Sequence, residues 1–295
     1  MKNTSANVIN RTLIYGLFIV IAVIVFYPLL YVVAGAFAPG KSISEMSIIP
    51  FTVETINPTT GQMSFSFKGA FTLDHFKHLI FETNYWLWFR NTLIISLWTA
   101  ILTVIISSIS AYVFSRFNFV FKHSLLMSLL ILQIFPSFVG MIAIYVILMR
   151  IGGLDTLWGL VLVYTAGNIP YNTWMVKSYM DTVSKNLDEA ARIDGASHFR
   201  IYSTIILPVV RPIISFLAIS SFTGPWMDFI FPKMVLRSPE KQTLAVGLIS
   251  FVDERVNEFT TFAAGSLIVA VPFIIFFLLT QKSMMMSMGS GAVKE

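Results

Sequence analysis

The chain alternates long apolar runs with short polar segments, and the apolar runs set its architecture. A helix needs about 20 apolar residues to cross the hydrocarbon core of a bilayer. Six stretches approach or exceed that length: residues 13–37, 86–114, 124–149, 157–175, 205–231 and 262–280. The pattern predicts an all-α membrane protein, a six-helix transmembrane bundle that forms a single domain over residues 1–295.

Proline interrupts most of these runs. It occurs in five of them, at Pro28, Pro136, Pro170, Pro225 and Pro272. Inside a membrane helix, proline bends the backbone and frees a carbonyl group that a neighbouring helix or water must satisfy. The runs are therefore expected to pack together around a polar path and not to act as isolated anchors.

Composition agrees with a membrane location. Of the 295 residues, 56% are apolar and only 12% are charged, against about 25% charged in soluble domains. The net charge of +5 comes from basic residues scattered singly between apolar runs, so no basic stripe indicates a nucleic-acid partner. The chain has no cysteine, which excludes disulfides, thiolate catalysis and cysteine-based metal sites.

The basic residues predict the orientation in the membrane. Six spans place both termini on one side, and that side holds 11 of the 20 Lys and Arg residues but only 5 of the 15 acidic ones. Short cytoplasmic loops are enriched in Lys and Arg, so both termini are expected in the cytoplasm. Residues 38–85 then form an extracytoplasmic loop, in which alternating residues predict a hairpin of strands 51–56 and 63–67.

A polar segment, residues 179–212, lies between the fourth and fifth spans on the predicted cytoplasmic side. Ser184 can cap a first helix, Gly195 can end it, Ser197 can cap a second short helix, and Leu207-Pro208 returns the chain to the membrane. This elbow has an apolar face. The pattern leaves open whether that face binds a partner or packs on the chain's own bundle.

The sequence of the elbow resembles the EAA loop of importer permeases of the ATP-binding cassette class. The resemblance rests on residues 188–196 (DEAARIDGA) and 206–208 (ILP). In that family this loop is a coupling helix that sits in a groove of a cytoplasmic ATPase subunit. The resemblance implies an ATPase-coupling role for Glu189, Ala190, Ala191, Asp194, Gly195, Leu207 and Pro208.

Further segments resemble the carbohydrate permeases of this class, the maltose/maltodextrin type above all. They are residues 26–30 (FYPLL), 243–247 (TLAVG), 262–265 (FAAG), 289–294 (GSGAVK) and 225–229 (PWMDF), where Met227 replaces an Asn of the family pattern. The resemblance implies an oligosaccharide substrate and a bacterial inner-membrane location. It also implies three kinds of partner: a second homologous permease subunit, two cytoplasmic ATPase subunits and an extracytoplasmic solute-binding protein. A tail similar to residues 283–295 reaches between the ATPase subunits of the maltose importer.

A sugar path needs aromatic rings for stacking and amide or hydroxyl groups for hydrogen bonds. Eight residues of the middle spans meet this requirement: Gln133, Tyr145, Tyr164, Asn168, Asn172, Trp174, Trp226 and Asp228. The alternative also stays open for each of them. Aromatic residues often form belts at the membrane surface, and polar groups often bridge helices.

Other functions fit the sequence less well. Residues 35–42 match the phosphate-loop pattern G-x-x-x-x-G-K-S, but they end a membrane span, whereas that loop needs a strand before it and a helix after it. ATP and Mg are therefore expected on separate ATPase subunits, with no cofactor, metal or catalysis on this chain. The alternatives are an importer of another solute or an ATP-independent secondary transporter, which would require ionisable residues at mid-membrane that these spans almost lack.

Overall fold

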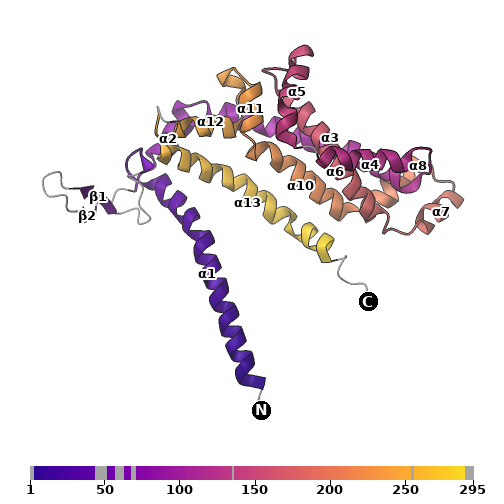
Figure 1. Ribbon diagram of the computed structural model, residues 1–295, viewed down its shortest axis with the longest axis horizontal. Coiled ribbons are helices and arrows are strands. Elements are labelled where there is room, and N and C mark those ends of the chain that lie inside the picture. The colour runs from indigo at the N-terminus through magenta and orange to yellow at the C-terminus, as the bar shows by residue number, and fades with distance from the viewer. Residues whose placement is uncertain are drawn as a thin grey trace. The chain divides into compact units, whose positions relative to one another are not determined.

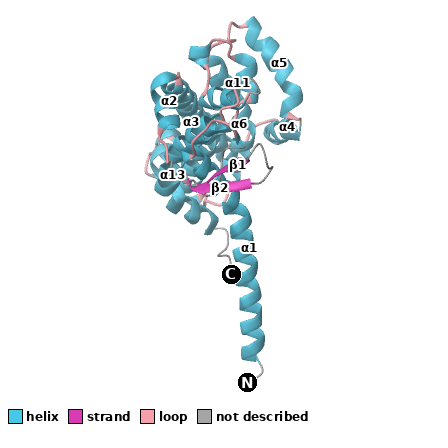
Figure 2. Ribbon diagram, turned by 90° about the vertical axis from the view of Figure 1, so that its left-hand side faces the viewer, coloured by secondary structure: helices cyan, strands magenta, loops and turns pink. Residues whose placement is uncertain are grey.

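The computed structural model describes residues 3–43, 52–56, 63–67, 71–134, 136–253 and 256–289. The chain divides into two compact units, Met1–Thr83 with Leu248–Phe273 and Asn84–Gly247 with Ile274–Glu295. Figures 1 and 2 show that the described elements are helices apart from one pair of short strands. The predicted all-α class is confirmed.

The first unit contains helix α1 (Asn3–Phe37), strands β1 (Thr52–Ile56) and β2 (Met63–Phe67), helix α2 (Asp74–Glu82), the 3-10 turn η4 (Ser250–Val252) and the start of α13 (Phe259–Gly289). The strands pair antiparallel, from Thr52 opposite Phe67 to Ile56 opposite Met63. The hairpin predicted from the alternation is thus confirmed, while its connecting residues lie outside the described part. Ala36, Ala263 and Ala264 form a small core in this unit.

The second unit is built around the long helix α3 (Tyr85–Arg116), which packs against α6 (Leu157–Met180) and α10 (Arg211–Met227). The other elements of this unit, in chain order, are α4 (Lys122–Ile134), α5 (Ser137–Arg150), α7 (Asn186–Ile193), α8 (His198–Arg200), the π-helical segment η2 (Ile201–Ile206), α9 (Leu207–Val209), α11 (Ile230–Val235), η3 (Pro239–Lys241) and α12 (Leu244–Ile249).

Small residues allow α3 to approach its neighbours closely. Its buried positions include Ser96, Thr99, Ala100, Thr103 and Ser107. Small and hydroxyl-bearing side chains of this kind let the backbones of membrane helices approach closely. Such close packing is needed because lipid chains are as apolar as leucine, so the hydrophobic effect does not drive helices together in a bilayer. The buried positions of α3 between residues 96 and 111 are all small, so the middle of this helix can pack closely on its neighbours.

The described residues do not establish all six predicted spans. Arg11–Phe37 and Tyr85–Arg116 are each long and apolar enough to cross a membrane. Two bent pairs bring the number to four if each pair is one span: α4 with α5, and His198–Val209 with α10 at 83°. Of the five prolines singled out in the sequence, only Pro136 lies at a break, whereas α1, α6, α10 and α13 continue through Pro28, Pro170, Pro225 and Pro272. The six-span topology therefore stays a prediction.

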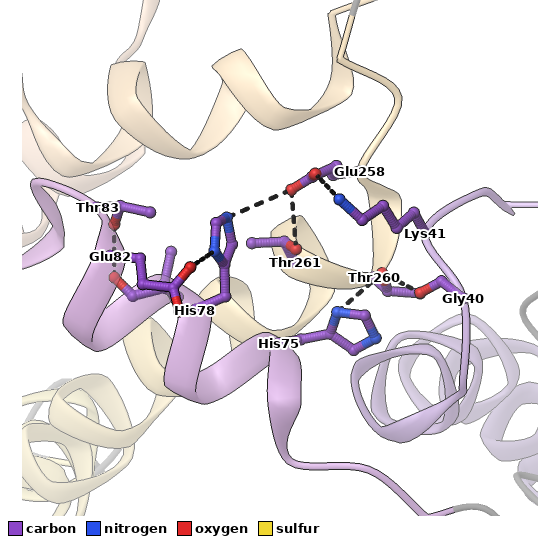
Figure 3. A network of polar contacts seen from close by, with 10 residues as sticks. Gly40, Lys41, His75, His78, Glu82, Thr83, Glu258, Thr260 and Thr261 are labelled. Atoms are coloured by element: carbon purple, nitrogen blue, oxygen red, sulfur yellow. Dashed lines mark hydrogen bonds and ion pairs between the residues drawn. The ribbon is translucent and has the colours of Figure 1, made fainter.

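A polar network joins three segments of the first unit (Figure 3). Glu258 pairs with Lys41 at 2.6 Å and accepts a hydrogen bond from Thr261 at 3.3 Å. His78 bridges Glu82 at 2.8 Å and Glu258 at 3.7 Å through its two ring nitrogens. The sequence does not predict this network, because nothing in the pattern shows that position 41 and position 258 meet.

This network predicts that the first unit loses stability in acid. Burial raises the pKa of Glu258, but the hydrogen bond and charge of Lys41 outweigh burial and hold that pKa below its ordinary value. The pKa of Lys41 is raised by the same contacts. In the unfolded chain the pKa of a glutamate is about 4.3. Because the pKa of Glu258 is lower in the folded protein, its ionised carboxylate stabilises the fold above about pH 4.3. This stability is lost as the pH falls through the folded-state pKa. The Lys41 contribution is lost only at strongly alkaline pH.

Hydrogen exchange at the start of α13 measures this effect. Protection is expected to fall below about pH 5 in the wild type and to depend less on pH in Lys41→Met. Lys77→Met is the matched control, because Lys77 lies 3.8 Å from Asp74 with both side chains largely exposed. Equal pH dependence in wild type and Lys41→Met would contradict the assignment.

Candidate coupling elbow and polar groove

The segment after α6 folds as the predicted helix–turn–helix elbow. Its first helix is α7, whose start is stabilised by a hydrogen bond of 3.3 Å from the Asn186 amide to the Ser184 hydroxyl. Gly195 ends α7 with a φ of 82°, a left-handed conformation that glycine adopts without steric cost. The Ser197 hydroxyl then accepts from the Arg200 amide and caps α8, as predicted.

Beyond α8 the backbone differs from the expected short helix. Residues Ile201–Ile206 form a π-helical segment, and α9 follows it directly, so that Leu207 and Pro208 continue the helix. The chain then turns at Val210 into α10. Tyr202 projects from the π-helical segment, and its hydroxyl lies 2.7 Å from that of Ser108 on α3. Wider π turns occur often at functional sites, and this one brings an aromatic side chain of the elbow against the bundle.

One face of the elbow packs on the chain's own bundle. Ala191, Ile201 and Ile206 are buried, and they belong to the same apolar cluster as Val176 and Met180 of α6. Ala191 therefore points its methyl group into the second unit. For this face, the structure agrees with the alternative in which the elbow packs on the chain's own bundle.

The other face of the elbow is exposed. Ile193 is 87% exposed, Phe199 75% and Leu187 45%. Glu189 and Ala190 are exposed on the same helix α7. Large apolar side chains grouped on a protruding surface indicate a binding site for another protein. The inner face thus packs on the chain's own bundle, while partner binding by the outer face stays a prediction.

A buried ion pair ties α7 to the end of α3. Arg116 Nε lies 2.7 Å from Asp188 Oδ2, and the two side chains are only 6% and 4% exposed. The Arg116 guanidinium also donates to the carbonyl groups of Met180 at 3.2 Å and Val183 at 3.1 Å. One arginine thereby joins α3, the end of α6 and the first turn of α7. Sequence analysis missed this residue, although a charged side chain that closes a long apolar run was an available signal.

Three of the predicted sugar-path residues meet at one groove. Tyr164 and Asn168 on α6 and Asp228 before α11 line a cavity of about 460 Å³ whose other walls are apolar side chains of α5, α6 and α11. The Tyr164 hydroxyl donates to Asp228 Oδ2 at 2.9 Å. Asp228 Oδ1 accepts from the amides of Ile230 and Phe231, so this carboxylate also caps α11. A few polar groups in an otherwise apolar groove fix ligand orientation.

The other candidates lie elsewhere. Asn172 is buried and donates to the carbonyl of Asn168, and the Tyr145 hydroxyl accepts from Arg237 at 2.6 Å. Trp226 is buried with its ring against Phe89 and Phe222, whereas Gln133 and Trp174 are exposed. Tyr145 thus joins α5 to the segment after α11, as the bridging alternative describes, whereas the hydrogen bond of Asn172 stays within α6. Among the described residues, no group of three or more His, Asp and Glu could hold a metal ion.

Long apolar helices packed into a largely helical chain, with an elbow whose outer face is exposed, define the class of membrane-embedded helical proteins. The chain belongs to the family of binding-protein-dependent transport system inner membrane components, which residues 103–282 match. The maltodextrin transport system permease protein MdxG of Bacillus subtilis is 37% identical over 295 residues, 100% of each chain. The galactooligosaccharides transport system permease protein GanQ of the same organism is 37% identical, covering 95% of this chain and 94% of that one.

Solved structures share the fold. A chain of a bacterial ABC transporter involved in the import of the acidic polysaccharide alginate superposes with a TM-score of 0.74 at 18% identity. The match covers 96% of this chain and 98% of that chain. At this identity the likeness establishes the fold alone.

Proposed function

We propose that this chain is the permease subunit of an ATP-driven importer of oligosaccharides of the maltodextrin kind, in the bacterial inner membrane with both termini in the cytoplasm. The single observation that carries the proposal is the elbow. Its inner face is bound to the bundle through Arg116 and Asp188, and its outer face presents Ile193 and Phe199 to solvent. An element that is fixed to the membrane helices on one side and exposed on the other can pass a movement from a bound partner to those helices.

The elbow does no chemistry in this proposal. Two cytoplasmic ATPase subunits bind ATP and Mg, and a second homologous permease subunit completes the translocation path. An extracytoplasmic solute-binding protein delivers the sugar. Closure of the ATPases on ATP has to favour the outward-facing state by a few kcal/mol to shift the population. In this proposal the ATPase subunit contacts Glu189 and Ala190, which are exposed on α7.

The relatives support an oligosaccharide substrate and leave two classes to be compared. Maltodextrins and galactooligosaccharides appear in the names of relatives that are each 37% identical to this chain. Uptake of radiolabelled maltodextrin and galactooligosaccharide by cells that carry this chain with its companion subunits tests the proposal. We expect ATP-dependent maltodextrin uptake that requires the binding protein. Uptake by the pure chain without ATP would favour a secondary transporter.

The groove yields a prediction for sugar contact. Asn168→Ala is expected to raise the KM for oligosaccharide uptake about fivefold, because an amide that bonds a sugar hydroxyl contributes about 1 kcal/mol. The maximal ATPase rate should stay unchanged. Ser178→Ala is the control on the same helix, since its hydroxyl bonds the carbonyl of Trp174. An unchanged KM in Asn168→Ala would remove this residue from the sugar path.

A further inference from the structure

A basic pocket lies where α3 turns into α4, and it shares no lining residue with the groove of Tyr164 and Asp228. Its volume is about 490 Å³. It is lined by Phe119, Phe121, Lys122, His123, Ser124, Leu126 and Lys177. The two lysines come from different helices, α4 and α6, and no acidic residue lines the pocket.

The charges around this pocket are unbalanced. Lys177 pairs with Asp181 at 2.6 Å, while the Lys122 ammonium donates to the carbonyl of Phe117 at 2.9 Å. The Lys122 ammonium is also repelled by the charges of Lys177 and Lys185, and the charge of Asp181 offsets only part of this repulsion. In addition, α4 begins with Lys122 and has no acidic residue in its first turn, although the start of a helix favours negative charge. A bound anion would relieve both sources of unfavourable energy.

The surroundings of the pocket are apolar and exposed. Val120 is 78% exposed and Phe121 73%, and Phe121 has a φ of 67°. The apolar helix α4 that follows has no buried residue. A chain with membrane-spanning helices presents such surfaces to acyl chains, and basic residues beside them lie at the level of the lipid headgroups.

We propose that this pocket binds the headgroup of an anionic phospholipid. Lys122 and Lys177 contact the phosphate, and the acyl chains lie along Val120, Phe121 and α4. Free phosphate shares the anionic chemistry but lacks the apolar part that the exposed side chains would cover. The proposal does not depend on which solute the chain transports.

Native mass spectrometry of the full chain with its companion subunits, extracted from membranes of equal phosphatidylglycerol and phosphatidylcholine content, tests this site. We expect the wild type to retain phosphatidylglycerol in preference. Lys122→Gln is expected to lower the preference about fivefold, which corresponds to the loss of one lysine near a lipid headgroup. Lys122→Arg keeps the positive charge and should therefore retain the preference for phosphatidylglycerol.

Lys233→Gln is the matched control, because Lys233 is an exposed lysine on α11, and it should leave the preference unchanged. Three outcomes would overturn the proposal. One is an unchanged lipid preference in Lys122→Gln. Another is displacement of the lipid by inorganic phosphate at millimolar concentration, which would indicate a site for a free anion. The third is loss of a companion subunit from Lys122→Gln with lipid retention intact, which would assign the pocket to a protein partner.

Discussion

Arg116→Ala is expected to abolish uptake and to destabilise the second unit by about 3–5 kcal/mol. The substitution would leave the Asp188 carboxylate, 4% exposed, without its cation. It would also remove the donors to the carbonyl groups of Met180 and Val183. A buried charge without a partner costs several kcal/mol, whereas the intact pair contributes much less than that to net stability. Thermal unfolding of the purified protein, measured beside sugar uptake in cells, checks the prediction.

The double variant Arg116→Met with Asp188→Leu separates stability from positioning. Replacing both members of a buried ion pair by apolar side chains of similar size is often neutral, so thermal stability should return. Uptake should stay low if the pair is needed to hold α7 in place. Arg150→Ala, at the exposed end of α5, is the control and should behave like the wild type. An Arg116→Ala protein as stable as the wild type would show that the pair is not required.

The position of this ion pair indicates how a movement of the elbow would reach the membrane helices. Asp188 lies in the first turn of α7 and Arg116 in the last turn of α3. Because α3 packs against both α6 and α10 through small side chains, a displacement of α7 would shift the helix at the centre of the second unit. Ser108 and Tyr202 provide a second connection between α3 and the elbow.

The elements of this chain could be read from its sequence because their signals are local. Apolar runs predict the helices, the alternation of residues 63–67 predicts the strand β2, and Ser197 and Gly195 mark the helix ends that the structure has. The π-helical segment at Ile201–Ile206 could not be predicted. Its residues have the same apolar spacing as an α-helix, and the π-helix differs from it only in the register of the backbone hydrogen bonds.

The candidate site was predictable only in part, for a related reason. The EAA resemblance locates the elbow, but the pairing of Arg116 with Asp188 joins residues 72 positions apart. The eight sugar-path candidates were chosen by residue type and span, and type alone cannot show that Tyr164 meets Asp228 while Tyr145 meets Arg237. The network of Lys41, His78 and Glu258 likewise depends on contacts between distant segments.

Gly195→Asp is expected to abolish uptake while the protein still inserts in the membrane. The φ of 82° disfavours side chains, but Asp and Asn adopt this conformation more easily than other residues do. No atom lies within 4 Å of a Cβ at this position, so Asp should fit within the chain itself. The expected loss of uptake therefore comes from a new negative charge beside Asp194, on the surface that would meet the ATPase subunit.

Gly195→Asn is the matched control for this experiment, because it has nearly the same shape and the same backbone tolerance without the charge. We expect it to retain most of the uptake. Glu189→Lys, which reverses an exposed charge in the first turn of α7, should abolish uptake like Gly195→Asp. ATPase activity and co-purification of the ATPase subunits measure whether contact or coupling is lost. Normal transport by Gly195→Asp would refute a role of this residue in coupling, because the structure leaves room for the side chain and the charge would then meet no partner.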